Sequence, residues 1–457
     1  MKINTTTKNV LERYAPQLNT ASLIEKVLFY IMLFFVLAGI PALYIQHFEG
    51  HYVTGMRDNV FWGVYIVNFI FYIGISYAGA LISGILYLLN VEWRKPIIRI
   101  AEMITVISTI LGPIYILLCM GRLDRLHHLI IYGRIQSPIT WDVIAISTYL
   151  IGSIIFLYLA TIQDFAILRD WKGLTVGRWR YPLYRFFAVS YQDTPRQRKL
   201  VHRGLTIMSI IIIPLAVIVH SVLSWIFGMT LRPGWHSTIF APYFVVAAVF
   251  SGTGVLIIAM WVYRKLYKLE DIITEKHFKY LGIILLVLGA LYGYFTFAEY
   301  LTNWYGSEKW ELELIYKLFN LNEFGWMFIF AAFVGVLLPL IIIGIPYLRN
   351  INSITFASLI VVVAMWVKRY IIIIPTLETP LLPMQESRIE YIHYSMTWVE
   401  WILTISGLAV FCLFFYLYSK FVPIIPVSES ASLVENSDAG INTNKKTLNE
   451  QNKNQVQ

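Results

Sequence analysis

Residues 141–163 read WDVIAISTYLIGSIIFLYLATIQ and contain one charged side chain, Asp142, in an otherwise apolar or weakly polar run. A helix that crosses the hydrocarbon core of a bilayer needs about 20 mostly apolar residues. This stretch therefore predicts a membrane-spanning helix with a carboxylate near one end. The whole chain has the same character, with 58% hydrophobic residues, 14% charged residues and a mean hydropathy of +0.64. A soluble domain carries roughly 25% charged residues, so the composition predicts a membrane protein.

Nine further stretches of similar length and hydropathy predict an all-α polytopic membrane protein with ten transmembrane helices. We expect a membrane domain over residues 25–421, a cytoplasmic N-terminal segment over 1–24, and a cytoplasmic tail over 422–457 that is too polar to fold alone. The N-terminal segment has no apolar core followed by a cleavage site, so the first span is expected to direct insertion itself. The ten spans are predicted at about 25–46, 60–89, 97–119, 141–163, 204–228, 239–263, 279–300, 324–348, 353–376 and 397–421.

Most of the 36 Lys and Arg residues fall in alternate connections between these spans, if the N-terminus is cytoplasmic. Cytoplasmic loops are enriched in these residues, so both termini are predicted to be cytoplasmic, in the inner membrane of a cell. The net charge of +9 then reflects membrane topology, and we expect no nucleic-acid partner. The largest basic connection contains WKGLTVGRWRYPLYRFFAVSYQ, residues 171–192, which fits either a short interfacial helix or a basic loop.

The chain has two cysteines, Cys119 and Cys412, in no metal-ligand pattern, so no metal, iron–sulfur or disulfide site is expected. His220 lies about two turns inside the fifth span, whereas the other histidines lie in connections or at helix ends. A bis-histidine haem needs two histidines at matching depth, so no haem is expected either. A buried histidine of this kind is a packing residue or a functional one.

Asp142 has two interpretations. Thr140 could cap the helix, with Asp142 in the first turn where the helix dipole favours a carboxylate, or Asp142 could accept a proton at the outer face. Asp164 lies roughly 33 Å further along the same helix and reads as an end residue that snorkels to the inner interface. Arg369 is expected to pair with a carboxylate of a neighbouring helix, because an unpaired charge in a membrane is costly. Other charged residues near the hydrocarbon are Glu102, Glu299, Glu323 and Glu400.

Several stretches together resemble the NrfD/polysulfide-reductase membrane-subunit family, in particular the ActC-type subunit of alternative complex III. The similarity extends over about residues 20–428. The stretches that carry it are GMRDNVFWGVYIVNFIFYIGISYAGALISGILYLL, SPITWDVIAISTYL, IQDFAILRD, VHSVLSW, RPGWHSTIFAPYFVVAAVFSG and MWVKRYIIII.

The resemblance implies ten spanning helices, eight of them in two four-helix bundles and two peripheral, with no bound redox cofactor. It implies quinol or menaquinol, drawn from the quinone pool, as a bound substrate near the outer face. It also implies partner proteins: an extracytoplasmic iron–sulfur subunit, a molybdopterin-like subunit, a sister membrane subunit of the same family, and cytochrome c subunits. Proton translocation through the bundles is a further expected activity.

Carried over position by position, the resemblance makes Asp142 the proton acceptor of the quinol site. Arg122 is expected to hold Asp142 ionised, since an opposite charge within about 4–6 Å favours the charged form. The expected quinone-binding residues are Tyr77, Cys119, Arg122, His127, His220 and His236. The expected proton-pathway residues are Asp164, Glu102, Glu299 and Arg369.

The sequence departs from the family at three positions. Tyr77 and Cys119 stand where relatives have histidines, and Ile226 stands where an aspartate is common. Alternative readings are therefore a membrane anchor of a sulfur-compound or molybdopterin reductase, and a quinone-free structural sister subunit. A secondary transporter is a third reading, which requires matched helix breaks in two halves of the chain.

Overall fold

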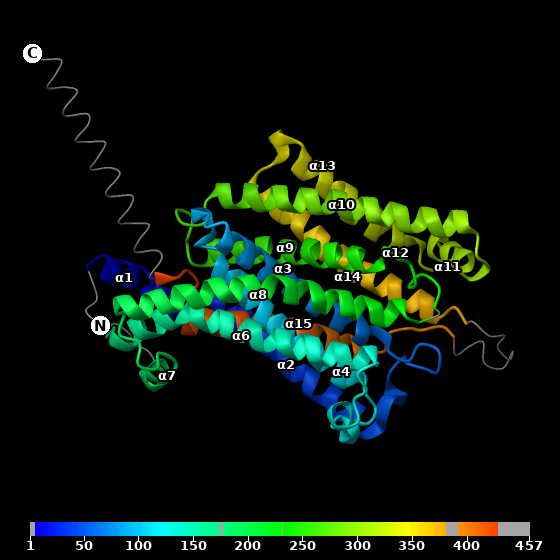
Figure 1. Ribbon diagram of the computed structural model, residues 1–457, viewed down its shortest axis with the longest axis horizontal. Coiled ribbons are helices and arrows are strands. Elements are labelled where there is room, and N and C mark those ends of the chain that lie inside the picture. The colour runs from blue at the N-terminus through cyan, green and yellow to red at the C-terminus, as the bar shows by residue number, and fades with distance from the viewer. Residues whose placement is uncertain (1–4, 172, 174–176, 231, 381–391, 428–457) are drawn as a thin grey trace, which may run out of the picture.

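The computed structural model describes residues 5–171, 173, 177–230, 232–380 and 392–427, and its regular structure within these ranges is entirely helical. In the part of the chain that the structure describes, ten helices are long and apolar enough to cross a membrane, which confirms the predicted number of spans. They run side by side along the long axis of the molecule (Figure 1). The spans are α2 (Leu23–Glu49), α3 (Gly63–Leu88), α4 (Ile98–Cys119), α6 (Pro138–Asp170), α8 (Pro195–Gly228), α9 (Phe240–Leu266), α10 (Glu275–Gly306), α12 to α13 (Gly325–Gly344), α14 (Ile351–Leu377) and α15 (Trp398–Phe421).

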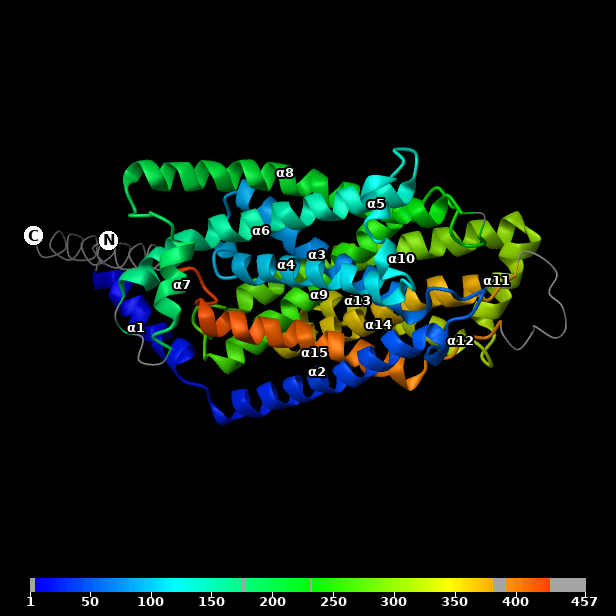
Figure 2. The ribbon, with the colours of Figure 1, turned by 90° about the horizontal axis from the view of Figure 1, so that it is seen from below.

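Eight of the spans form two bundles of four, as predicted. Helices α3, α4, α6 and α8 pack together, and so do α9, α10, the α12–α13 segment and α14. Helix α3 also packs against α9 and joins the bundles, while α2 and α15 pack against each other beside the first bundle (Figure 2). Gly79 allows the close approach of α3 and α4, because a Cβ there would lie 2.1 Å from the carbonyl oxygen of Ala101.

The eighth span is not a continuous α-helix. Between α12 (Gly325–Ile329) and α13 (Leu338–Gly344), residues Phe330–Leu337 form a π-helix, η4. Pro339 lies two residues beyond the π-helix and has no backbone N–H to donate to the preceding turn, so the regular hydrogen-bond ladder changes here. Gly335 fits the tight contact with α14, because its Cβ would lie 2.2 Å from Ala364 Cβ.

Part of the N-terminal segment is helical, which the sequence analysis did not predict. Residues Thr5–Asn19 form helix α1, which buries Leu11, Tyr14 and Leu18 against the C-terminal end of α15. Three short helices lie in connections: α5 (His128–Ile131), α7 (Arg180–Phe187) and α11 (Lys309–Phe319). Residues 171–192 were expected to form either a short interfacial helix or a basic loop, and α7 shows that part of this connection is helical.

The expectation that the tail begins at residue 422 is wrong for its first six residues. Val422, Ile424, Ile425 and Val427 are buried in the described structure, because they pack against the inner ends of the first bundle. Residues 428–457, where the rest of the predicted polar tail lies, are outside the described residues.

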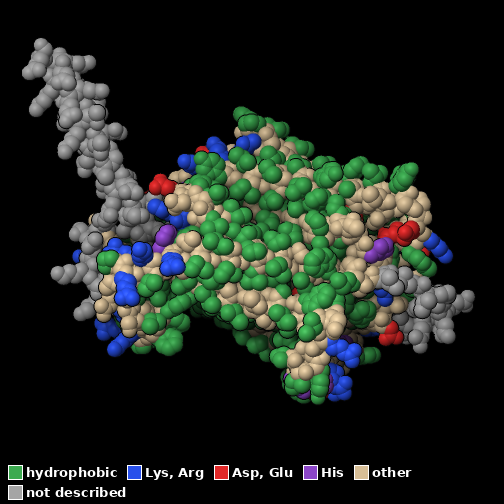
Figure 3. Space-filling model, viewed as in Figure 1, with side chains coloured by type: hydrophobic (Ala, Val, Ile, Leu, Met, Phe, Trp, Pro, Cys, Tyr) green, Lys and Arg blue, Asp and Glu red, His purple; other side chains and the backbone are tan. Residues whose placement is uncertain are grey.

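Charge follows the long axis of the molecule. Hydrophobic side chains cover the middle, and Lys and Arg gather at the end where α1 and α7 lie, with a smaller basic group at the opposite end (Figure 3). Helix α1 and the C-terminal end of α15 both lie at that more basic end. This distribution fits the predicted orientation, and we call that end inner and the opposite end outer.

Candidate functional site

Asp142 lies inside the outer end of α6, one turn further along than predicted. The helix begins at Pro138 with Ser137 as N-cap, so the expected cap at Thr140 is wrong and Asp142 is beyond the first turn. Its side chain is buried, and Oδ1 has no hydrogen-bond partner among the described residues. A buried carboxylate oxygen without a partner costs free energy, which makes this position a candidate for ligand or proton binding.

Tyr77 and His220 form a second buried polar group in the same bundle. Tyr77 on α3 and His220 on α8 have ring centroids 4.3 Å apart, and both side chains are almost fully buried. The Tyr77 hydroxyl and His220 Nδ1 also have no hydrogen-bond partner among the described residues. Together with Asp142 Oδ1, the first bundle therefore has three buried polar atoms without a described hydrogen-bond partner, one on each of α3, α6 and α8. We call Asp142, Tyr77 and His220 the first-bundle triad.

The other predicted quinone-site residues lie elsewhere. The expected pairing of Arg122 with Asp142 is wrong: Arg122 is exposed and forms an ion pair of 2.9 Å with Asp124. His127 is exposed and packs against His128, and Cys119 is partly buried at the end of α4.

His236 is exposed in the connection between α8 and α9. Its Nε2 lies 3.6 Å from Glu311 on α11, so the structure places it beside the outer mouth of the second bundle. Burial raises the pKa of Glu311, and the Gly234 N–H and His236 oppose that shift.

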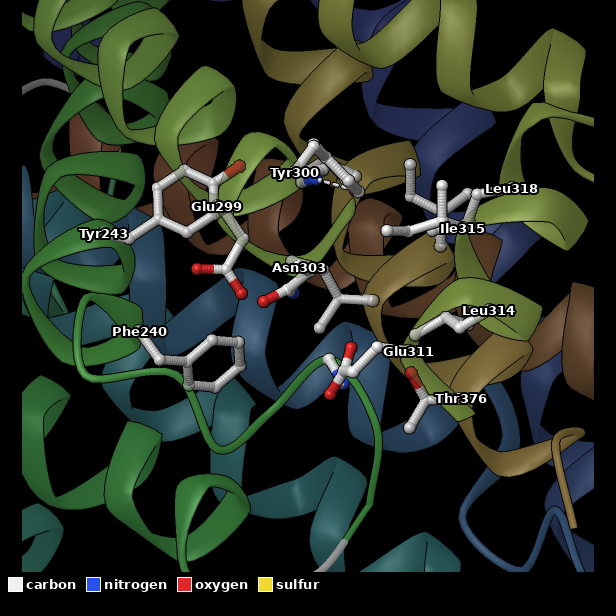
Figure 4. Close-up of a pocket in the computed structure, with 14 residues that line it drawn as sticks. Phe240, Tyr243, Glu299, Tyr300, Asn303, Glu311, Leu314, Ile315, Leu318 and Thr376 are labelled. Atoms are coloured by element: carbon white, nitrogen blue, oxygen red, sulfur yellow. Dashed lines mark hydrogen bonds between the residues drawn. The ribbon is translucent and has the colours of Figure 1, made fainter. Parts of the chain in front are cut away.

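Four polar side chains lead from that outer end into the second bundle, and we call them the polar line: Glu311, Asn303, Glu299 and Lys368. A cavity of about 30 Å³ is lined by Glu311, Glu299, Asn303 and Lys368, and the carboxylates of Glu299 and Glu311 reach toward it (Figure 4). A second cavity of about 10 Å³ shares Lys368 with the first. A water needs roughly 10–15 Å³, so these are water-sized spaces.

Lys368 is the central group of this line and was missed by the sequence analysis, although it precedes Arg369 in the quoted MWVKRYIIII stretch. It is 3% exposed, and its Nζ donates a hydrogen bond of 2.8 Å to the Tyr300 hydroxyl. Glu299 accepts a hydrogen bond of 2.7 Å from Ser237, and its other carboxylate oxygen has no hydrogen-bond partner among the described residues. The sequence does carry a signal for Lys368, because it is a second positive charge beside Arg369 in an otherwise apolar span.

Arg369 joins the two bundles but pairs with no carboxylate among the described residues, contrary to the prediction. Its guanidinium donates to the Met365 carbonyl oxygen at 2.7 Å and to Ser251 Oγ at 3.1 Å, and it lies over the Phe71 ring. Arg369, Lys368 and His220 line the same 10 Å³ cavity. His220, one member of the first-bundle triad, therefore shares a cavity with Lys368 of the second bundle.

The inner end of the first bundle holds the remaining predicted residues. Asp164 does not snorkel: it is fully buried and forms an ion pair of 2.6 Å with Arg99 on α4. Glu102, one turn along from Arg99, lines a cavity of about 120 Å³ together with Arg94, Gln163 and His202. The expected proton-pathway residues therefore occupy two places, with Glu102 and Asp164 at the inner end and Glu299 and Arg369 in the outer half.

Comparison with known proteins identifies the family of the chain. The model of the family described as "Polysulphide reductase, NrfD" matches residues 52–380. The chain belongs to the NrfD family. The match includes the whole of both bundles, so the first-bundle triad and the polar line are features of an NrfD protein.

Curated relatives of this NrfD chain are named as subunits of oxidoreductases. A selenate reductase subunit of Mesobacillus selenatarsenatis is 25% identical over 420 residues, which is 88% of this chain and 95% of the relative. The Hdr-like menaquinol oxidoreductase integral membrane subunit of Archaeoglobus fulgidus is 24% identical over 420 residues, 89% of this chain and 96% of the relative. A putative dimethyl sulfoxide reductase membrane subunit of Halobacterium salinarum is 28% identical over 221 residues, 48% of this chain and 47% of the relative.

These findings confirm the predicted family and a multi-pass membrane subunit of the reductase type. Particular similarity to the ActC-type subunit stays a prediction. So do the roles of the individual site residues, the absence of a bound cofactor and the orientation in the membrane.

Proposed function

We propose that this NrfD protein is the quinol-binding membrane subunit of a multi-subunit respiratory oxidoreductase similar to alternative complex III, in the cell inner membrane. The observation that carries the proposal is the first-bundle triad. Asp142 Oδ1, the Tyr77 hydroxyl and His220 Nδ1 are buried without hydrogen-bond partners in one bundle of the described structure. A quinol ring has two hydroxyl groups that can donate and accept hydrogen bonds, and would satisfy such atoms in an apolar environment.

The chemistry assigned to this site is quinol oxidation, which releases two protons and two electrons for each quinone formed. Asp142 accepts the proton of one ring hydroxyl, and the proton of the other hydroxyl passes by way of His220 Nδ1 into the proton route described below, while Tyr77 orients the ring by hydrogen bonding. The electrons pass to an iron–sulfur partner on the outer face, and from there to a molybdopterin-like protein. The names of the Archaeoglobus and Mesobacillus relatives, a menaquinol oxidoreductase and a selenate reductase, support the choice of menaquinol and of a reductase complex.

Protons are proposed to leave through the polar line of the second bundle. His220 and Lys368 line one cavity, and Lys368 and Glu299 line the next, which reaches Glu311 at the outer mouth. Both cavities are about the size of a water molecule, so ordered water could link these groups into a hydrogen-bonded route for a proton. Glu102 and Asp164 at the inner end are then the candidates for uptake if protons are also translocated.

A second candidate is the membrane anchor of a molybdopterin reductase in an arrangement different from alternative complex III. It is favoured by the relatives, two of which are named as subunits of selenate and dimethyl sulfoxide reductases. The two candidates share the quinol site and differ in the partner that takes the electrons. Identification of the proteins that co-purify with the tagged chain distinguishes them.

The test is electron transfer from a quinol to the intact complex carrying Asp142→Asn. Asn keeps the shape of the side chain and removes the proton acceptor, so turnover should fall by about 10²-fold or more. Asp124→Asn is the matched control, because Asp124 is 61% exposed beside Arg122. Wild-type turnover and quinol affinity in the Asp142→Asn complex would remove Asp142 from the mechanism.

A further inference from the structure

The outer half of the molecule has a larger cavity, which is separate from the first-bundle triad. It measures about 600 Å³ and lies between α12, α14, the N-terminal end of α15 and the segment that precedes α15. Ligand pockets for small molecules measure about 300–1,000 Å³. This cavity is therefore ring-sized, whereas those of the polar line are water-sized.

The walls of the cavity are aromatic and thioether side chains. Trp366 and Tyr370 on α14, Trp401 on α15 and Met327 and Met396 on either side contribute to the lining. Flat aromatic faces and a polarisable sulfur suit a planar ring better than an acyl chain. Trp401 is 48% exposed and Met327 is 41% exposed on helices that span the membrane, so the cavity borders the lipid-facing surface.

One end of the cavity carries hydrogen-bonding groups. Glu378 is 3% exposed, and its carboxylate accepts a hydrogen bond of 2.7 Å from the Tyr394 N–H. The other carboxylate oxygen pairs with Lys317 at 2.9 Å and lies 3.8 Å from His393 Nδ1. A carboxylate has about four acceptor positions, so Glu378 can still accept a hydroxyl from a ligand.

Hydrogen bonds outside the cavity hold its walls in place. Trp366 Nε1 donates to Asn68 on α3 at 2.8 Å. The Tyr394 hydroxyl donates to Glu400 at 2.6 Å, and Glu400 also accepts from the backbone N–H of Gly55 at 2.8 Å and caps α15. The aromatic walls are therefore positioned before any ligand binds, which lowers the entropic cost of binding.

We propose that this cavity binds the ring of an isoprenoid quinol or quinone, as a second site that exchanges with the bilayer. The choice of quinol as the occupant rests on the proposed function. The ring lies between Trp366, Tyr370 and Trp401, one hydroxyl donates to Glu378, and the isoprenoid chain leaves past Met327 into the lipid. The mouth faces the membrane, from which a water-insoluble substrate must enter.

The test is photolabelling of the full complex in vesicles of one zwitterionic phospholipid, with a photoreactive quinone and peptide mapping by mass spectrometry. We expect label on residues 322–327 or 393–401. Met396→Trp and Met327→Trp fill the cavity and should each lower that label by about tenfold, equal to about 1.4 kcal/mol of binding free energy. Leu408→Trp is the matched control, since Leu408 is 55% exposed on the lipid-facing side of α15.

The outcomes separate this inference from the proposed function. Label on peptides that contain Asp142, Tyr77 or His220, with none at the cavity, overturns the second site and leaves the proposed function standing. Label at the cavity alone supports the second site and contradicts the first-bundle triad. Label at the cavity that excess phospholipid removes and excess unlabelled quinone does not would identify a lipid site, and would overturn the inference.

Discussion

Arg99 on α4 and Asp164 on α6 form an ion pair of 2.6 Å in which neither side chain is more than 1% exposed. Arg99 also donates to the carbonyl oxygen of Pro423 at 2.8 Å, and Asp164 accepts from the Val427 N–H at 3.2 Å. The pair therefore ties the first bundle to the segment that follows the last span. Two buried opposite charges stabilise a structure only if they remain together.

The Arg99–Asp164 pair predicts a large loss of stability when one partner is removed. Asp164→Asn leaves Arg99 buried without a counter-charge, and should lower the free energy of unfolding by about 3–5 kcal/mol. Arg99→Met with Asp164→Leu should recover most of that loss, because an apolar pair of similar size avoids the desolvation cost. Denaturant unfolding of the detergent-solubilised chain measures both.

Asp170→Asn is the control for the ion pair, since Asp170 pairs with Arg169 where both side chains are partly exposed. A partly exposed pair contributes about 1 kcal/mol or less. If Asp164→Asn and Asp170→Asn lower the free energy of unfolding equally, burial of the Arg99–Asp164 pair makes no extra contribution to stability.

The polar line of the second bundle predicts that Glu299 and Lys368 act together in proton release. Glu299→Gln and Lys368→Met should each slow proton release to the outer side of proteoliposomes by about 10²-fold or more, the lower end of the range for proton-transfer groups. The double variant should be little slower than either single one, because both residues serve one route. A pH-sensitive dye outside the vesicles, read during quinol oxidation, measures the rate.

Glu313→Gln is the matched control for Glu299, because Glu313 is an exposed glutamate of α11 that lines neither cavity of the polar line nor the cavity of about 600 Å³. Quinol affinity should stay unchanged in all of these variants. Proton release at the wild-type rate in Glu299→Gln would exclude this route.

Glu311 predicts a pH-dependent stability. Burial raises the pKa of Glu311 above its ordinary value of 4.5 in the folded chain. The unfolded chain therefore loses this proton at a lower pH than the folded chain, so the free energy of unfolding falls as pH rises from the ordinary to the raised pKa. Glu311→Gln mimics the protonated form and should remove that part of the slope.

Thermal unfolding of both proteins between about pH 4 and pH 8 tests this, with Glu308→Gln as an exposed control on the same outer segment. The curves of wild type and Glu311→Gln should coincide at the acid end and separate as pH rises. A wild-type stability that rises with pH over this range would contradict the raised pKa of Glu311. So would a wild-type stability equal to that of Glu311→Gln at every pH.

The sequence alone determined the number of spans, their approximate positions along the chain and the depth of Asp142, Asp164 and His220. These follow from hydropathy and length along the chain, because each span must cross the bilayer by itself. Only the tertiary structure decided which polar groups meet. Asp164 forms an ion pair with Arg99 and does not reach the membrane interface. Arg369 donates a hydrogen bond to Ser251 and does not pair with a carboxylate among the described residues. Arg122 forms an ion pair with Asp124 and not with Asp142. The rotation of each helix about its axis depends on how its neighbours pack, and that information is spread over residues far apart in the chain.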